Sequence, residues 1–340
     1  MNRPVWRDSM APYERASWAR GLLDVATSVL PYAALTVLMY ATLGQVPFWA
    51  TLALAIPTAG FLLRTFIVFH DCTHGAFLPS RRANVWVGRV TGLLVFQPFA
   101  NWRRAHAVHH GTAGDLDRRG TGDVATMTCD EYVASPWTKR LGYRLFRNPL
   151  VMFGLGPVWS LMIGPRIWSR SMRPRQLRSV LLTNVVLAVA VGAICWLVGW
   201  QAWLVVQMPS AIIAGTAGVW LFYVQHQFED VYWETGERWG YADAALRGSS
   251  YLKLPQPFRF FTGNIGLHHV HHLSTKVPNY NLQRAHDENP IFWDVPVLTA
   301  RDGAGAVRLK VIDPDAGRLL TWSELRVRRA ALAAASPAVP

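Results

Sequence analysis

Two long stretches of the chain contain no charged residue, and they determine what the rest of the sequence can form. The first covers residues 25–63 and the second covers residues 179–228. A helix needs about 20 apolar residues to cross a bilayer, so each stretch can cross twice with a tight turn between the crossings. Gly44 and Pro47 mark that turn in the first stretch, and Gly199 marks it in the second. The pattern predicts an all-α integral membrane protein with four transmembrane helices in two hairpins.

Polar and mixed segments surround the hairpins, and we expect them to form a helical cap on the cytoplasmic side. We interpret the chain as one membrane domain made of an interfacial segment, a hairpin, a cytoplasmic segment, a second hairpin, another cytoplasmic segment and a tail: residues 1–24, 25–63, 64–178, 179–228, 229–300 and 301–340. Residues 85–100 and 149–165 are expected at the membrane interface. Alternating residues over 307–322 predict a small β-hairpin. The Ala- and Pro-rich end from about Ala330 is predicted to be disordered.

The distribution of charge predicts which way the hairpins face. The chain has 34 Lys and Arg against 21 Asp and Glu, a net charge of +13. Neither hairpin turn carries Lys or Arg, so the positive-inside tendency places both termini and the central segment in the cytoplasm, which we take to border a bacterial inner membrane. The basic residues flank membrane spans and form no separate basic domain, so we expect no nucleic-acid partner. Anionic headgroups or an acidic soluble protein fit the charge instead.

Histidine is the residue type that points to chemistry. All but one of the 11 histidines fall into four groups. In three groups the members are three or four residues apart, so on a helix they would share a face, and imidazole is the commonest protein metal ligand. The groups are His70 and His74; His106, His109 and His110; His226; and His268, His269, His271 and His272. The pattern predicts a metal centre assembled from segments far apart in the sequence.

Three metals compete for this centre on the basis of ligand chemistry. A structural zinc takes four ligands, usually including cysteine, and so would leave most of these histidines unused. Copper usually takes softer sulfur ligands and fewer imidazoles. Two iron ions, each with four or five nitrogen ligands, would use the whole set without the carboxylates of Glu-rich di-iron bundles.

The histidine groups resemble the three histidine boxes of the integral-membrane fatty acid desaturase family. The boxes match in order and spacing, and the two flanking hairpins match as well. Residues 114–120, 263–273 and 278–282 are similar to the acyl-lipid branch of the family. The resemblance implies a non-haem di-iron centre that uses O₂ to introduce a cis double bond into the acyl chain of a membrane lipid or an acyl thioester.

The resemblance also implies that the lone His226 is a further iron ligand. The predicted metal ligands are then His70, His74, His106, His109, His110, His226, His268, His271 and His272. His269 would face away from a helix face shared by its neighbours, and we assign no role to His286. Asp71, Glu229 and Asp230 stand beside ligands, and we expect them to orient metal-bound imidazoles.

The sequence also predicts an external electron donor and leaves alternative functions open. The chain has no flavin, haem or iron–sulfur motif, so electrons are expected from an external donor, and an acidic ferredoxin would suit the basic cytoplasmic face. A lipid hydroxylase, an alkane monooxygenase and a carotenoid ketolase share the same boxes and remain alternatives. A membrane metal transporter or sensor is the alternative outside enzymes, although its ionisable residues would be expected near the membrane midplane.

Overall fold

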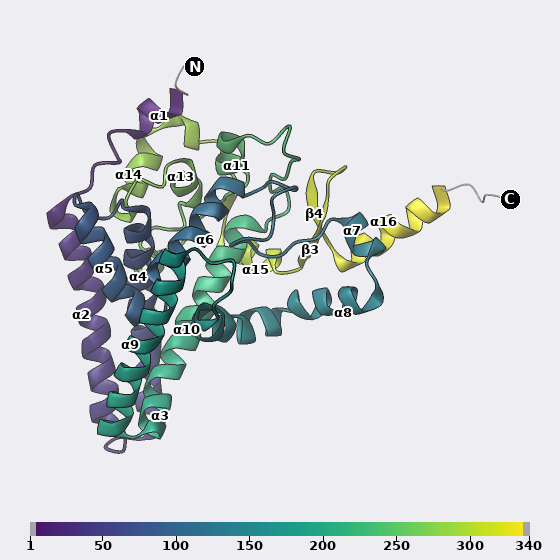
Figure 1. Ribbon diagram of the computed structural model, residues 1–340. Helices are drawn as coiled ribbons and strands as arrows, with labels where there is room; N and C mark the ends of the chain where they lie inside the picture. Colours follow the sequence, from purple (N-terminus) through teal and green to yellow (C-terminus); the bar gives the residue numbers. More distant parts are fainter. Residues whose placement is uncertain (1–4, 336–340) are drawn as a thin grey trace.

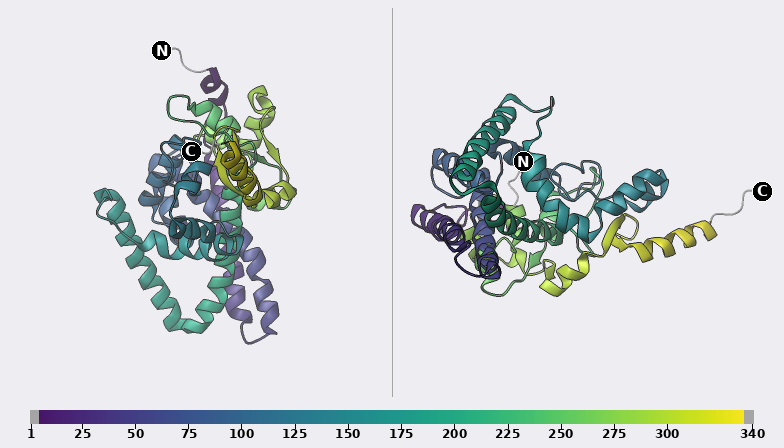
Figure 2. Two further views of the ribbon diagram at one scale, coloured as in Figure 1. Left: turned by 90° about the vertical axis from the view of Figure 1, so that its right-hand side faces the viewer. Right: turned by 90° about the horizontal axis from the view of Figure 1, so that it is seen from below.

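The computed structural model describes residues 5–335, with side chains from residue 6 to residue 330, and it is mostly helical. Four helical segments are long and apolar enough to cross a membrane: α2 (Trp18–Thr42), the α3–α4 pair (Phe48–Ala53 and Ala55–His74), α9 (Pro174–Val198) and α10 (Trp200–His226). This confirms the predicted pair of hairpins. Figure 1 shows these helices side by side, and Figure 2 shows the hairpin turns at the end away from the cap.

The turns form where glycine lets the chain reverse. Gly44 and Gly199 both have positive φ angles, of 79° and 87°, which residues with a Cβ atom rarely adopt. Gly75, with φ of 74°, ends α4 directly after His74. The second membrane helix therefore continues beyond the uncharged stretch as far as His74.

The membrane-spanning helices differ in how much of their surface the protein covers. α4 is central and contacts α2, α5 (Arg81–Leu94) and α10. In α9, by contrast, only 6% of the apolar window is buried inside the protein. Exposed leucine, valine and tryptophan side chains cover α9, which is the surface expected of a helix facing lipid.

The cap is built from short helices at the upper end of the bundle (Figure 1). Besides α5 it contains α1 (Val5–Met10), α6 (Phe99–Thr112), α7 (Cys129–Ala134), α8 (Trp137–Phe146), α11 (Tyr241–Arg247), α12 (Phe258–Phe261), α13 (His268–Leu273), α14 (Asn279–Glu288) and α15 (Ala300–Ala306). Residues 151–163, expected at the interface, form two turns of π-helix with exposed Leu155, Trp159 and Ile163.

The two ends of the chain differ from the sequence expectations. Residues 1–24 were expected at the membrane interface, but within the described residues 5–17 Met10 and Tyr13 are buried in a cap cluster with Leu273 and Phe292. The predicted β-hairpin is present as β3 (Leu309–Asp313) and β4 (Arg318–Thr321), which pair antiparallel. It is followed by α16 (Trp322–Ala335), so the prediction of disorder from Ala330 was wrong as far as residue 335, and residues 336–340 lie outside the described part. A short parallel pair, β1 (Tyr251–Leu252) with β2 (Val297–Leu298), was not predicted.

A buried arginine fastens the C-terminal hairpin to the membrane helices. Arg147 is 1% exposed and donates hydrogen bonds to the Tyr223 hydroxyl (3.1 Å), the Gln227 side-chain oxygen (2.8 Å) and the Leu309 carbonyl (3.0 Å). The Lys310 amine donates in turn to the Arg147 carbonyl at 2.7 Å. These contacts join the end of α8, the end of α10 and β3 at one point.

We therefore predict that Arg147→Ala loosens the C-terminal segment, because several buried acceptors lose a charged donor at once. The free energy of unfolding should fall by about 2 kcal/mol or more, and proteases should cleave after residue 306 more quickly than in the wild type. Lys139→Ala, on the exposed side of α8, is the matched control. Equal thermal unfolding and cleavage rates for the two variants would show that Arg147 does not fasten this segment.

Candidate metal centre

Four helices deliver the predicted ligands to one place between the spans and the cap. His70 and His74 occupy the last turn of α4, and His226 is the last residue of α10. The other ligands come from α6 and α13, which lie in the cap. Since α4 and α10 are candidate membrane spans, the centre lies at the ends of these spans that meet the cap (Figure 1).

The nine predicted ligands divide into two separate clusters. In each cluster the ligand nitrogens lie within 4.8 Å of one another. The first cluster has five members, His70, His74, His106, His110 and His271. The second has four, His109, His226, His268 and His272. The group of His106, His109 and His110 thus serves both clusters, because His109 belongs to the second and the other two belong to the first.

The distances between nitrogens suit shared metal ions. In the first cluster His106 Nε2 lies 2.9 Å from His70 Nε2 and 3.1 Å from His110 Nε2. In the second, His226 Nε2 lies 3.2 Å from His109 Nε2 and 3.0 Å from His268 Nε2. Ligands about 2.1 Å from one metal ion and at right angles to each other are about 3 Å apart, so the observed spacings fit.

Burial keeps the imidazoles in the form that binds metal. For the ligands outside the spans, burial first and neighbouring imidazoles second lower the pKa well below 6.5; these are His106, His110, His268, His271 and His272. His74 Nε2 and His272 Nε2 are buried without any hydrogen-bond partner. A neutral imidazole nitrogen in that position has a free lone pair, and a bound cation would satisfy it. The two clusters could therefore hold two metal ions.

Two of the ligands contact a carboxylate through Nδ1, the ring nitrogen that faces away from the cluster. Asp71 Oδ1 lies 2.8 Å from His70 Nδ1, and its other oxygen accepts a hydrogen bond from the Asn279 backbone N–H at 2.6 Å. Asp123 Oδ1 lies 2.5 Å from His109 Nδ1. A proton on Nδ1 leaves the Nε2 lone pair directed at the cluster. Asp71 was predicted from the sequence and Asp123 was not. Nothing in the sequence of a polar loop indicates which of its acidic residues folds back onto a ligand.

The other two acidic residues named from the sequence lie elsewhere. Glu229 and Asp230 are exposed, and Glu229 pairs with Arg318 at 3.2 Å instead of contacting an imidazole. The reason is local: α10 ends at His226, so the chain leaves the helix face that points at the cluster. His226 Nδ1 instead faces the Gly248 carbonyl at 3.0 Å, a backbone group that sequence spacing could not reveal.

The two histidines left outside the predicted ligand set contact each other. His269 Nε2 lies 3.0 Å from His286 Nδ1, and both rings lie against Phe292. His269 is fully buried on the side of α13 away from both clusters, and burial lowers its pKa to about 3. The pair therefore packs α13 against α14 and adds no ligand to either cluster.

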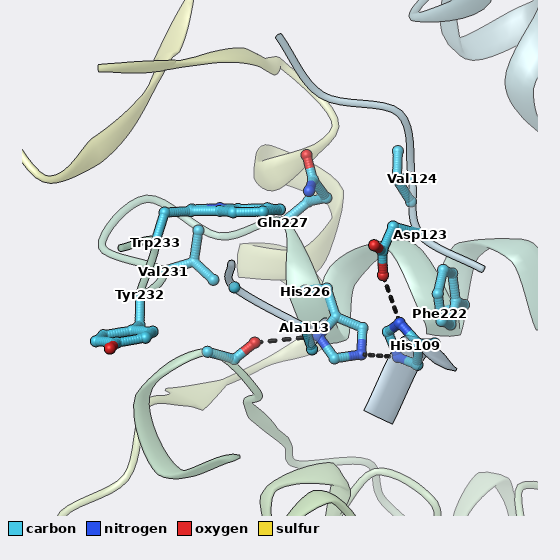
Figure 3. A pocket seen from close by; sticks show the side chains of 12 residues that line it. His109, Ala113, Asp123, Val124, Phe222, His226, Gln227, Val231, Tyr232 and Trp233 are labelled. Atoms are coloured by element: carbon cyan, nitrogen blue, oxygen red, sulfur yellow. Dashed lines mark hydrogen bonds and ion pairs between the residues drawn. The ribbon is translucent and has the colours of Figure 1, made fainter. Parts of the chain in front are cut away.

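Aromatic rings surround the first cluster, and a pocket adjoins the second. Trp102 lies over His106, with ring centroids 4.2 Å apart, and Phe69 packs against Trp102 at 5.1 Å. A small pocket borders the second cluster, with His109, His226, Asp123, Phe222 and Trp233 among its lining residues (Figure 3). The first cluster thus has an apolar side, and the second lies beside a small pocket.

Comparison with known proteins, over most of the chain, identifies the same family as the histidine groups do. The fatty acid desaturase family model matches residues 47–294. A Bacillus subtilis protein named fatty acid desaturase is 40% identical over 317 residues, which are 93% of this chain and 90% of the relative. In Synechocystis sp., an sn-1 oleoyl-lipid 12-desaturase is 26% identical over 286 residues (82% of this chain, 76% of the relative). An sn-1 acyl-lipid omega-3 desaturase (ferredoxin) from the same organism is 27% identical over 238 residues (65% and 62%). The chain belongs to the fatty acid desaturase family.

Proposed function

We propose that this protein is an O₂-dependent acyl-lipid desaturase that introduces a cis double bond at a non-haem di-iron centre. The observation that carries the proposal is the convergence of nine imidazoles into clusters of five and four where the spans meet the cap. Family membership makes the protein an oxidoreductase. Among residues 6–330 no carboxylate joins either cluster, so the metal ions would have an all-nitrogen ligand set.

The proposed chemistry explains why such a centre is required. A methylene C–H bond in an acyl chain has no acidity or polarity that side chains could exploit. Two irons held by the histidines would supply the O₂-activating chemistry that breaking such a bond needs. The chain itself positions the imidazoles: Asp71 and Asp123 fix the rings of His70 and His109, while the aromatic side formed by Phe69 and Trp102 excludes water.

A membrane lipid is the proposed substrate. The ligands in α4 and α10 stand at the ends of membrane spans, so an acyl chain in the bilayer would reach the centre without leaving its apolar surroundings. Relatives named as acting on oleoyl-lipid and acyl-lipid substrates support the same class. An acyl thioester is the alternative carrier that product analysis would distinguish.

The proposed electron donor is a ferredoxin on the cytoplasmic side. One relative carries ferredoxin in its name. The net charge of +13 favours an acidic partner. The absence of Lys and Arg from both hairpin turns supports a cytoplasmic cap in a bacterial inner membrane, with both termini on the same side.

The direct test is expression of the protein in a host that lacks this activity, followed by analysis of fatty acid methyl esters from each lipid class. We expect a new cis-unsaturated acyl chain in membrane lipids. His110→Ala and His272→Ala, one from each cluster, should abolish it while membrane insertion persists. His286→Asn, which keeps a hydrogen-bonding group beside His269, should remain active. Hydroxylated products without a new double bond would refute desaturation.

A second prediction concerns the metal itself. The purified wild type should contain about two irons per chain, one for each cluster. Loss of one ligand should weaken one cluster more than the other, so His271→Ala and His268→Ala should each retain about one iron. Iron analysis of the His286→Asn protein provides the control and should give the wild-type content. Two tightly held irons in both ligand variants would contradict the assignment of these histidines.

A third prediction compares the iron affinity of the protein after replacement of Asp123 with its iron affinity after replacement of Glu229. Asp123→Asn weakens the acceptor for His109 Nδ1–H, so iron affinity should fall by about 10- to 100-fold. Glu229→Gln should bind iron as the wild type does, because Glu229 faces solvent and Arg318. Competition with an iron chelator measures both affinities. Equal affinities for the two variants would mean that Asp123 does not hold its ligand in place.

A further inference from the structure

Two segments of the chain carry basic residues without any acidic residue. Residues 72–114 and 132–228 contain no Asp or Glu, although they include many of the arginines of the chain. Six of those arginines come from α5, α6 and the approach to α9, and we call them the arginine collar: Arg81, Arg103, Arg170, Arg173, Arg175 and Arg178. No carboxylate side chain lies within either segment to neutralise these arginines.

The fold brings the collar together. α6 is joined to the start of α9 by two hydrogen bonds, from the Ala100 N–H to Ser179 Oγ at 3.0 Å and from Gln176 Nε2 to Asn101 Oδ1 at 3.1 Å. Burial lowers the pKa of Arg103, and so do the nearby charges of Arg175 and Arg81, which come from two other helices.

The collar also lacks internal neutralisation. Over residues 6–330, the ion pairs with carboxylates involve other arginines and no member of the collar. Arg170, Arg173, Arg175 and Arg178 are moreover exposed. Uncompensated and accessible guanidinium groups are suited to binding an external anion.

The position of the collar indicates which anion that is. Four of its members lie at the start of α9, the candidate span with the smallest buried share of its apolar window. Three large apolar side chains beside it are more than half exposed, Trp86 (65%), Ile167 (51%) and Trp168 (56%). Tryptophan at this level is typical of the boundary between the hydrocarbon core and water, where lipid headgroups lie.

A separate helix, α8, also has the features of a segment at the membrane surface. It lies crosswise to the spans (Figure 1) and exposes Trp137, Leu141 and Leu145, spaced four residues apart on one face. Lys139 and Arg140 lie next to that face, and the opposite side is anchored by buried Tyr143. An exposed apolar stripe with adjacent basic residues is typical of a helix in the plane of the membrane surface.

We propose that the arginine collar is a binding site for the phosphate groups of anionic phospholipids. Four exposed arginines within residues 170–178 at the start of a span match the juxtamembrane basic clusters that attract such lipids. An acidic protein could approach from the same side of the membrane, but the exposed Trp86 and Trp168 put the collar at the level of the lipid headgroups, which favours a lipid as its ligand. The site is distinct from the metal centre and does not depend on the reaction proposed for it.

The test uses the full-length protein in mixed micelles with equal amounts of phosphatidylglycerol and phosphatidylcholine, and mass spectrometry of the lipids that remain bound. We expect phosphatidylglycerol to be enriched on the wild type. Replacing Arg170, Arg173, Arg175 and Arg178 together by Gln should lower the enrichment by about tenfold, because each arginine adds to the attraction. The same four positions replaced by Lys should keep most of it, since the charge is retained.

The matched control removes the same charge elsewhere. Arg301, Arg308, Arg326 and Arg329 are exposed residues of the C-terminal part, and their joint replacement by Gln should leave the enrichment unchanged. Wild-type enrichment in the collar Gln variant, or an equal loss in the control, would overturn the proposal. A collar Gln variant that keeps its lipid but no longer binds an acidic ferredoxin would assign the surface to a protein partner instead. An improperly folded Gln variant would be replaced by the single change Arg175→Gln, for which a partial loss is expected.

Discussion

The structure depends on nine imidazole rings that are packed into two adjoining clusters with no carboxylate among the cluster members. Burial first and neighbouring imidazoles second lower the pKa of the cap ligands His106, His110, His268, His271 and His272 well below the ordinary value, so these rings are neutral. Neutral rings still point lone pairs at one another, and only a cation satisfies several of them at once. The clusters therefore make sense as metal sites and would be poorly stable as a polar core.

The rest of the fold serves this requirement. α4 and α10 reach the centre from the membrane, so the spans act as fixed supports for three of the ligands. α6 and α13 approach from the cap: Asp123 holds His109 of α6, and His269 of α13 packs against His286 of α14. Arg147 fastens the C-terminal hairpin to the end of α10, next to His226. The membrane part and the cap thus meet at the ligands, and neither could move far without separating them.

Much of this arrangement could be predicted from the sequence, because it follows from periodic features. Uncharged stretches fixed the number of spans, and the spacing within each histidine group identified the helix faces. Contacts made by irregular segments could not be predicted. Asp123 reaches His109 from a loop, the Gly248 carbonyl faces His226 by a backbone contact, and Glu229 turns to Arg318 because α10 ends three residues earlier. The division of His106, His109 and His110 between the two clusters likewise depends on the angle at which α6 meets α4 and α10.

The central claim is that two metal ions are held by histidine nitrogens alone among the protein's side chains. X-ray absorption at the iron edge of the loaded, purified protein tests it most directly, because imidazole rings give a distinctive outer-shell scattering that carboxylates and thiolates lack. The structure predicts an average between four and five imidazoles per iron, from clusters of four and five histidines. An average of two or fewer imidazoles per iron, or iron bound by sulfur, would contradict the account.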